Sequence, residues 1–161
     1  MYKRPLLFAL LLLVTAISIA QVKSPEEFLG YKIGSRFTPH WKIVSYFQHV
    51  SASAPGMVKL VQYGETNEHR PLYLAIVSTE ENIRDLENIR INNLRLANLS
   101  KDKVAPSESG PAIVWLSYNV HGNEASSSEA SLLTLFSLVD PRNTQTKQWL
   151  KNTVVIRLIR K

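Results

Sequence analysis

The spacing of the apolar positions changes along the chain, and the first regular pattern is helical. Trp41, Val44, Phe47 and Val50 recur at intervals of three residues, which is the period of one face of an α-helix. This pattern predicts an amphipathic helix from about Pro39 to Ser51.

The next pattern is typical of paired strands. The segments Val58 to Tyr63 and Leu72 to Ser78 are rich in β-branched and aromatic residues. Between them, Gly64 to Arg70 is polar and short enough to form the tip of a hairpin. We therefore expect two antiparallel strands.

A long helix is predicted after the hairpin. Ser78 is followed three residues later by Glu81, which is the spacing of a capping box at the start of a helix. The helical pattern extends to about Leu99, and a loop with Pro106 and Gly110 then interrupts it.

The last third of the chain alternates strands with helices. The segment Ala112 to Tyr118 is almost wholly apolar, as expected for a strand whose two faces are both covered. A helix is predicted from Glu124 to Val139, a short helix from Gln145 to Lys151, and a final strand from Thr153 to Ile159. The order of elements indicates an α/β fold with a mixed sheet and right-handed crossovers.

Residues 1–20 carry the pattern of a secretory signal peptide. Lys3 and Arg4 precede the apolar run Leu6 to Ile19, and small residues stand around a cleavage site after Ala20. Cleavage would leave residues 21–161 as one exported domain, with no stable insertion in the membrane. The run is shorter than the ~20 residues that a spanning helix needs.

Charge and cysteine content narrow the class of protein further. The net charge is +6, but five basic residues lie in the signal or in the last five positions, and without them it falls to +1. No basic stripe with interleaved aromatic residues remains, so a nucleic-acid partner is not expected. The absence of cysteine excludes a disulfide framework and suits a periplasmic or extracellular bacterial protein.

The candidate chemistry lies just after the apolar strand. His121 and Glu124 are separated by two residues at a predicted strand-to-helix turn, and imidazole nitrogen and carboxylate oxygen are both good zinc donors. A helix amino terminus also favours an ionised Glu124. The alternative is purely structural: Glu124 caps its helix and His121 forms a hydrogen bond within the loop.

The same residues carry a resemblance to a known family. The segment Trp115 to Ala125 resembles the first zinc-binding segment of the M14 zinc carboxypeptidases. Tyr63 to Leu72 is similar to the hairpin that precedes it in that family, and Ser24 to His40 resembles the start of the exported bacterial branch. The resemblance implies a partial three-layer mixed sheet with helices on both faces, truncated relative to the whole family domain.

The resemblance implies a function as well as a fold. His121 and Glu124 would be the first two ligands of one Zn²⁺, and Asn123 stands where some members carry a substrate-contacting arginine. The family's third ligand is a later histidine, and none follows His121 here. The chain is thus expected to be an amino-terminal part of a zinc metallocarboxypeptidase, without catalytic residues of its own and inactive alone, whose substrate is a peptide or protein.

Two alternatives to the metallocarboxypeptidase hypothesis remain open at the level of sequence. The same fold could support a zinc-dependent amide or acyl hydrolase, and a metal-free exported binding module is a third hypothesis. His40, His49 or His69 could in principle supply a missing ligand. The oligomeric state is not indicated by any pattern.

The end of the chain departs from the resemblance. In the family, a strand like Thr153 to Ile156 continues into Ile-Asp-Pro, whereas this chain ends with Arg157 to Lys161. One set of codons for Arg-Leu-Ile-Arg encodes Ile-Asp-Pro when read two bases later. We therefore hypothesise that residues 157–161 are read out of frame, and we expect the last strand to leave an edge of the sheet open.

Overall fold

The computed structural model describes residues 21–119, 121 and 123–159 of the chain. The predicted signal peptide, residues 1–20, lies outside these described residues. Within them, no helix combines the length and the apolar character that crossing a membrane requires.

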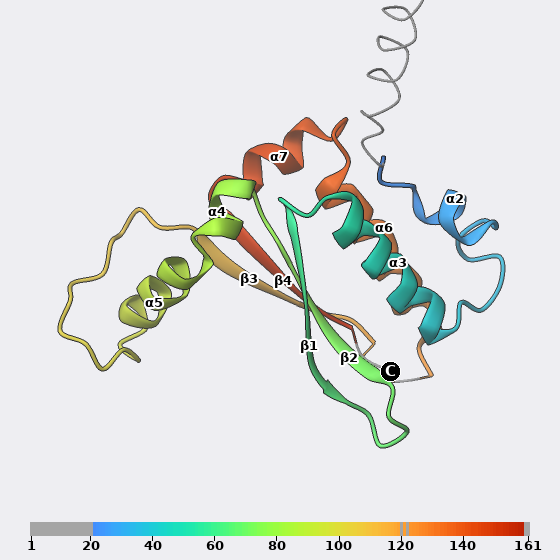
Figure 1. Cartoon of the computed structure of the whole chain (residues 1–161), viewed down its shortest axis with the longest axis horizontal. Helices are drawn as coiled ribbons and strands as arrows, with labels where there is room; N and C mark the ends of the chain where they lie inside the picture. Colours follow the sequence, from blue (N-terminus) through green and yellow to red (C-terminus); the bar gives the residue numbers. More distant parts are fainter. Residues whose placement is uncertain (1–20, 120, 122, 160–161) are drawn as a thin grey trace, which may run out of the picture.

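A four-stranded mixed sheet forms the centre of the structure, with helices on both sides of it (Figure 1). The strands are β1 (Val58–Glu65), β2 (Pro71–Val77), β3 (Ala112–Ser117) and β4 (Thr153–Ile159), in the order β1-β2-β4-β3. The β1–β2 and β2–β4 pairs are antiparallel, and β3 and β4 are parallel. The predicted mixed α/β fold is confirmed.

Six helices connect and cover the strands in the described part of the chain. They are α2 (Pro25–Leu29), α3 (His40–Ser53), α4 (Glu80–Arg84), α5 (Leu86–Leu96), α6 (Ala125–Val139) and α7 (Thr144–Leu150). The helix expected from Pro39 to Ser51 is therefore confirmed as α3. The helix predicted from Glu124 begins one residue later, with Glu124 as its N-cap residue.

The hairpin is formed by β1 and β2 as predicted. Val58 pairs with Val77 at one end and Glu65 with Pro71 at the other. His69 lies in the tip with a φ of 58°, in the left-handed region that histidine tolerates better than most side chains.

The single long helix expected from Ser78 to Leu99 is wrong in two respects. Asp85 has a non-helical ψ of 16° and separates α4 from α5. The N-cap residue is Thr79, whose side chain accepts a hydrogen bond from the Asn82 amide. Ser78 is buried, and its hydroxyl donates to the carbonyl groups of Leu150 and Thr153 beside it, so it is used in packing rather than in capping.

The main core lies between the sheet and the pair α3 and α6. Its central members are fully or almost fully buried: Tyr46, Phe47 and Val50 of α3, Leu132, Leu135 and Val139 of α6, and Ala75, Val77 and Val155 of the sheet. Val44, Phe47 and Val50 of the predicted apolar face of α3 are buried, whereas Trp41 of that face is exposed. The packing of α3 on α6 therefore fixes α6, and with it the turn that precedes α6.

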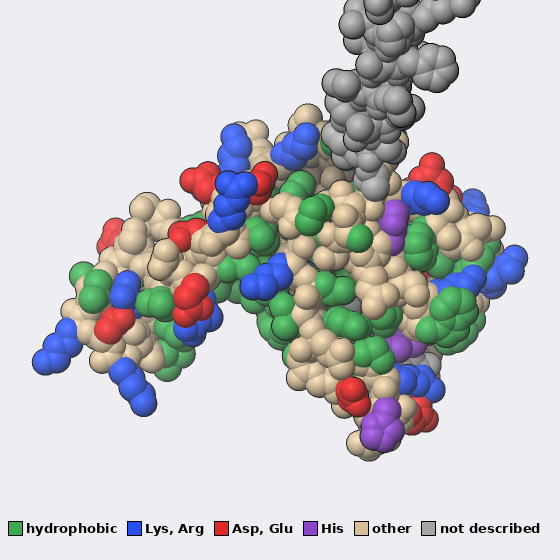
Figure 2. All heavy atoms as spheres, viewed as in Figure 1, with side chains coloured by type: hydrophobic (Ala, Val, Ile, Leu, Met, Phe, Trp, Pro, Cys, Tyr) green, Lys and Arg blue, Asp and Glu red, His purple; other side chains and the backbone are tan. Residues whose placement is uncertain are grey.

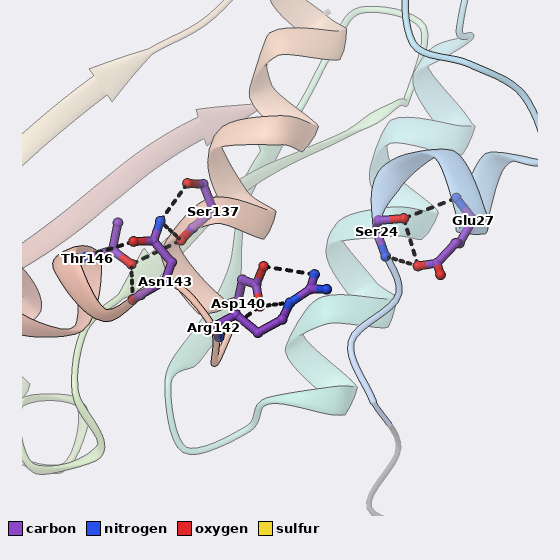
Figure 3. Close-up of polar contacts among 7 residues, drawn as sticks. All are labelled: Ser24, Glu27, Ser137, Asp140, Arg142, Asn143 and Thr146. Carbon is purple, nitrogen blue, oxygen red and sulfur yellow. Dashed lines mark hydrogen bonds and ion pairs between the residues drawn. The ribbon is translucent and has the colours of Figure 1, made fainter.

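Short polar contacts close the helix ends around this core (Figure 3). Ser24 and Glu27 form a reciprocal capping box at α2, and the Asn143 side chain accepts from the Thr146 amide at the start of α7. Between α6 and α7, the Arg142 guanidinium donates to Asp140 and holds the pKa of that carboxyl below its ordinary value.

The prediction that both faces of the strand Ala112 to Tyr118 are covered is wrong, because the adjacent residues Val114 and Trp115, which point to opposite faces of β3, are both exposed. β3 is also an edge strand. β4 inserts between β2 and β3, so one side of β3 has no neighbouring strand within the described residues. The Trp115 side chain is 55% exposed. The open edge expected from the sequence thus belongs to β3, while the last strand, β4, lies inside the sheet.

Candidate metal centre

The connection from β3 to α6 is a tight turn that brings His121 and Glu124 together. The Glu124 amide donates to the His121 carbonyl at 3.1 Å, which closes the turn immediately before α6. Asn119 enters the turn with a φ of 59°. Asparagine is one of the few residues apart from glycine that adopts this left-handed conformation readily.

The two candidate ligands converge. His121 Nδ1 lies 3.1 Å from Glu124 Oε1. Two donors bound to one tetrahedral zinc, with bonds of about 2.0–2.1 Å, lie roughly 3.3–3.4 Å apart. The side chains are 70% and 58% exposed, so water has access to the space beside them. A zinc ion would fit between these donor atoms with a small widening of their separation.

The Glu124 side chain does not cap its helix. It forms no hydrogen bond with the amides of the first turn of α6, although Glu124 occupies the N-cap position. The alternative that Glu124 caps its helix is therefore wrong. The other part of that alternative, a hydrogen bond of His121 within the loop, is confirmed, and the partner is Glu124 itself. The carboxylate lies at the positive end of a 15-residue helix with an oxygen free of the backbone.

One polar contact that supports the turn was not predicted from the sequence. The Ser127 hydroxyl in the first turn of α6 donates to Asn119 Oδ1 at 2.7 Å, and Asn119 is buried. Asn119 Nδ2 has no hydrogen-bond partner within the part of the chain that the structure describes. The tolerance of asparagine for positive φ was the signal that could have identified Asn119 as the residue that shapes this turn.

The other three histidines lie in different environments. His49 Nε2 accepts from the Lys23 amide and its ring stacks on Phe28, while His69 lies at the hairpin tip beside Glu65. His40 Nε2 is 3.3 Å from the Pro71 carbonyl. Among the described residues, no group of three or more histidine, aspartate or glutamate side chains is arranged to hold a metal.

Two further polar residues near the turn have distinct surroundings. Asn123 is an exposed turn residue. Glu129, one turn along α6, is buried and accepts hydrogen bonds from the Gly34 amide at 2.6 Å and from the Thr38 hydroxyl. Glu129 therefore faces the amino-terminal segment, where both of its carboxylate oxygens form structural hydrogen bonds.

Arg157 lies on the core side of β4 as a fully buried cation. Its guanidinium carbon is 5.2 Å from the ring centre of Phe47 and 4.6 Å from that of Tyr118. Nη1 donates to the Ser131 carbonyl, but Nε and Nη2 have no hydrogen-bond partner among the described residues. Burial lowers the pKa of the guanidinium below its ordinary value.

Comparison with solved structures shows a similar fold in two proteins. One is thrombin activatable fibrinolysis inhibitor (TAFI), with a TM-score of 0.56 and 17% identity over 88% of this chain and 28% of that chain. The other is carboxypeptidase A from Helicoverpa armigera, with a TM-score of 0.55 and 14% identity over 83% of this chain and 29% of that chain. The chain thus spans less than a third of either protein.

Comparisons of sequence give the family. No curated protein matches the chain. The model of the zinc carboxypeptidase family, Peptidase M14, matches residues 43–159, which include the hairpin, both central strands and the turn with His121 and Glu124. The chain therefore belongs to the M14 zinc carboxypeptidase family.

Proposed function

We propose that this chain contributes the first two zinc ligands, His121 and Glu124, of an exported metallocarboxypeptidase that releases carboxy-terminal residues from peptides. The observation that carries the proposal is the 3.1 Å approach of His121 Nδ1 to Glu124 Oε1 at the end of β3, in a chain of the M14 family. Export is supported by the signal-like pattern of residues 1–20.

The chain's own part in the reaction is to position the metal donors. Zinc, when bound, supplies Lewis acidity and lowers the pKa of a bound water. His121 and Glu124 would present one nitrogen and one carboxylate oxygen from the same turn, and the Asn119–Ser127 contact would hold that turn against α6. A catalytic zinc takes three protein ligands and an open position. Two proposed ligands therefore predict weak zinc binding and no turnover by this chain alone.

Zinc titration tests the proposal, and the chain contains a matched control. His69 and Glu65 form a second exposed histidine–carboxylate pair, 3.4 Å apart, at the hairpin tip. Calorimetry should show zinc binding that His121→Ala removes and His69→Ala leaves unchanged. Equal zinc affinity of the His121→Ala variant and the unaltered chain would overturn the proposal and favour a metal-free binding module.

A peptidase assay tests the second part of the proposal. With added zinc, the unaltered chain should release no carboxy-terminal residue from short peptides. Chelator-sensitive release by the purified chain would show that its own residues complete the site.

We also propose that β4 is built for an apolar residue at position 157. The fully buried guanidinium with two unpartnered nitrogens supports this proposal, and it agrees with the hypothesis that residues 157–161 are read out of frame. The nucleotide sequence after the codon for Ile156 tests that hypothesis. Codons that do not contain Ile-Asp-Pro in a displaced frame would refute it.

A further inference from the structure

A groove runs along the segment that leads into α3, away from the core. A hollow of about 640 Å³ lies between the start of α3 and the start of β2. A second hollow, of about 460 Å³, lies between the same segment and the first half of α6. Phe37 lines both hollows, so we treat them as one feature and call it the Phe37 groove.

Two aromatic side chains are exposed along the Phe37 groove. Phe37 is 58% and Trp41 is 64% exposed, and both line the larger hollow together with Val44 and Pro71. Figure 2 shows hydrophobic and basic side chains together on the side of the molecule that carries α2 and the start of α3. Exposed aromatic side chains at a hollow are typical of a binding surface, because their burial by a ligand removes apolar area from water.

Two cations lie at or near the groove: Arg36 lines the smaller hollow, and Lys42 lies in the first turn of α3. The smaller hollow is also lined by Glu129, but that carboxylate is buried and already accepts two hydrogen bonds. Arg36 Cζ and Lys42 Nζ lie 4.7 Å and 4.9 Å from the centre of the same ring, that of Tyr31. Among the described residues, neither cation forms an ion pair with a carboxylate, whereas Arg70 at the far end of the groove pairs with Glu68. An anionic group that lies close to both cations would be attracted to each of them.

The segment that carries these residues is held in place before any ligand arrives. The buried Glu129 of α6 binds the Gly34 amide and the Thr38 hydroxyl, and Thr38 in turn accepts from the Tyr31 hydroxyl at 2.9 Å. Gly34 has a φ of 80°, which the tight turn of the segment requires. A preformed surface loses less conformational entropy on binding, which favours affinity.

We propose that the Phe37 groove binds an extended acidic peptide segment that also carries an aromatic side chain. Arg36 and Lys42 would pair with its carboxylates, and Phe37 and Trp41 would pack against its apolar side chain. Two cations are too few for a phosphate backbone, whose binding depends on many such contacts. The smaller hollow reaches Ala125 and Ser126, directly after Glu124. If the proposed function holds, and only then, the groove binds those residues of a peptide substrate that precede its carboxy-terminal residue.

Anisotropy of a labelled peptide tests the groove on the whole chain. The probe is an eight-residue peptide with four glutamates and one phenylalanine, and the reference peptide has glutamine in place of each glutamate. We expect saturable binding of the acidic peptide, and at least a tenfold loss of affinity in Trp41→Ala and in Lys42→Glu. The reference peptide should bind at least tenfold more weakly.

Matched variants make the result specific to this groove. Trp149 is 57% exposed on α7, and Lys151 is exposed just beyond it, so Trp149→Ala and Lys151→Glu should leave the affinity unchanged. Binding that is equally weakened by these controls, equal binding of the reference peptide, or the absence of saturable binding would overturn the proposal. His121→Ala should bind the peptide normally even if it no longer binds zinc, which separates failure of the groove from failure of the metal site.

Discussion

At the scale of single residues, Arg157 is the position where a charged side chain lies in the least suitable environment, because it is fully buried in the apolar core. The Arg157 guanidinium is stabilised by cation–π contacts with Phe47 and Tyr118. Two of its nitrogens, however, are buried away from water without a hydrogen-bond partner among the described residues. An unpaired buried polar group costs about 1–3 kcal/mol or more when it is charged. The ring contacts are worth about 2 kcal/mol or more each when desolvated, but removing the charged guanidinium from water without an anionic partner costs several kcal/mol, so we expect Arg157 to destabilise the fold.

Replacing Arg157 with leucine should therefore stabilise the protein. We expect the free energy of unfolding to rise by roughly 1–4 kcal/mol, the range seen when buried charges are replaced by apolar side chains. Urea denaturation of both proteins measures this. The same change at the exposed Arg84 of α4 should alter stability by less than about 0.5 kcal/mol. A less stable Arg157→Leu protein would mean that the guanidinium is needed where it is.

Asn119 should stabilise the turn through both its side chain and its backbone. Asn119→Ala loses the hydrogen bond from Ser127 and the polar side chain that makes the left-handed conformation tolerable for asparagine, and we expect a loss of about 2–3 kcal/mol in unfolding free energy. Asn119→Gly loses only the hydrogen bond, so it should be intermediate. Urea denaturation of the two variants checks this order, and a glycine variant less stable than the alanine variant would contradict it.

At the scale of elements, β3 is an edge strand without the usual protection. Ala112 to Ser117 contains no charged residue and no proline. The Ala112 amide donates to Asn152 at the start of β4, so by alternation the backbone groups of Ile113, Trp115 and Ser117 face outward. Such an edge is a template for pairing with another chain.

We predict that the unaltered protein associates or precipitates, and that Trp115→Lys lowers this tendency. Light scattering during concentration should show less aggregate for the variant, because a lysine on the edge opposes strand pairing. Trp149→Lys, which removes a similarly exposed tryptophan from a helix, should have a smaller effect. A monomeric, reversibly melting unaltered protein would contradict the account of this edge.

The elements were predictable where one local pattern dominated. The spacing of Val44, Phe47 and Val50 predicted α3, and the strand Thr153 to Ile159 matches β4 at both ends. The capping prediction failed at Ser78 because carbonyl groups from the α7–β4 connection, more than 70 residues away, bind its hydroxyl. The exposure of β3 depends on strand order, which local spacing does not encode.

At the scale of the whole molecule, the sequence predicted only two residues of the candidate site, His121 and Glu124. The spacing of His121 and Glu124 indicated a shared turn, and the structure brings their donor atoms to 3.1 Å. The Phe37 groove needed long-range packing, since Glu129 of α6 shapes the segment from Tyr31 to Thr38. The chain spans under a third of each of the two solved structures that it resembles.

The most direct test is X-ray absorption at the zinc edge of the zinc-loaded chain. The account predicts one imidazole nitrogen at about 2.0–2.1 Å, with carboxylate and water oxygens at about 2.0–2.2 Å completing the shell. The imidazole signal should disappear in His121→Ala and persist in His69→Ala. Two or more imidazoles around the zinc, or an unchanged spectrum without His121, would contradict the claim that this turn holds the metal.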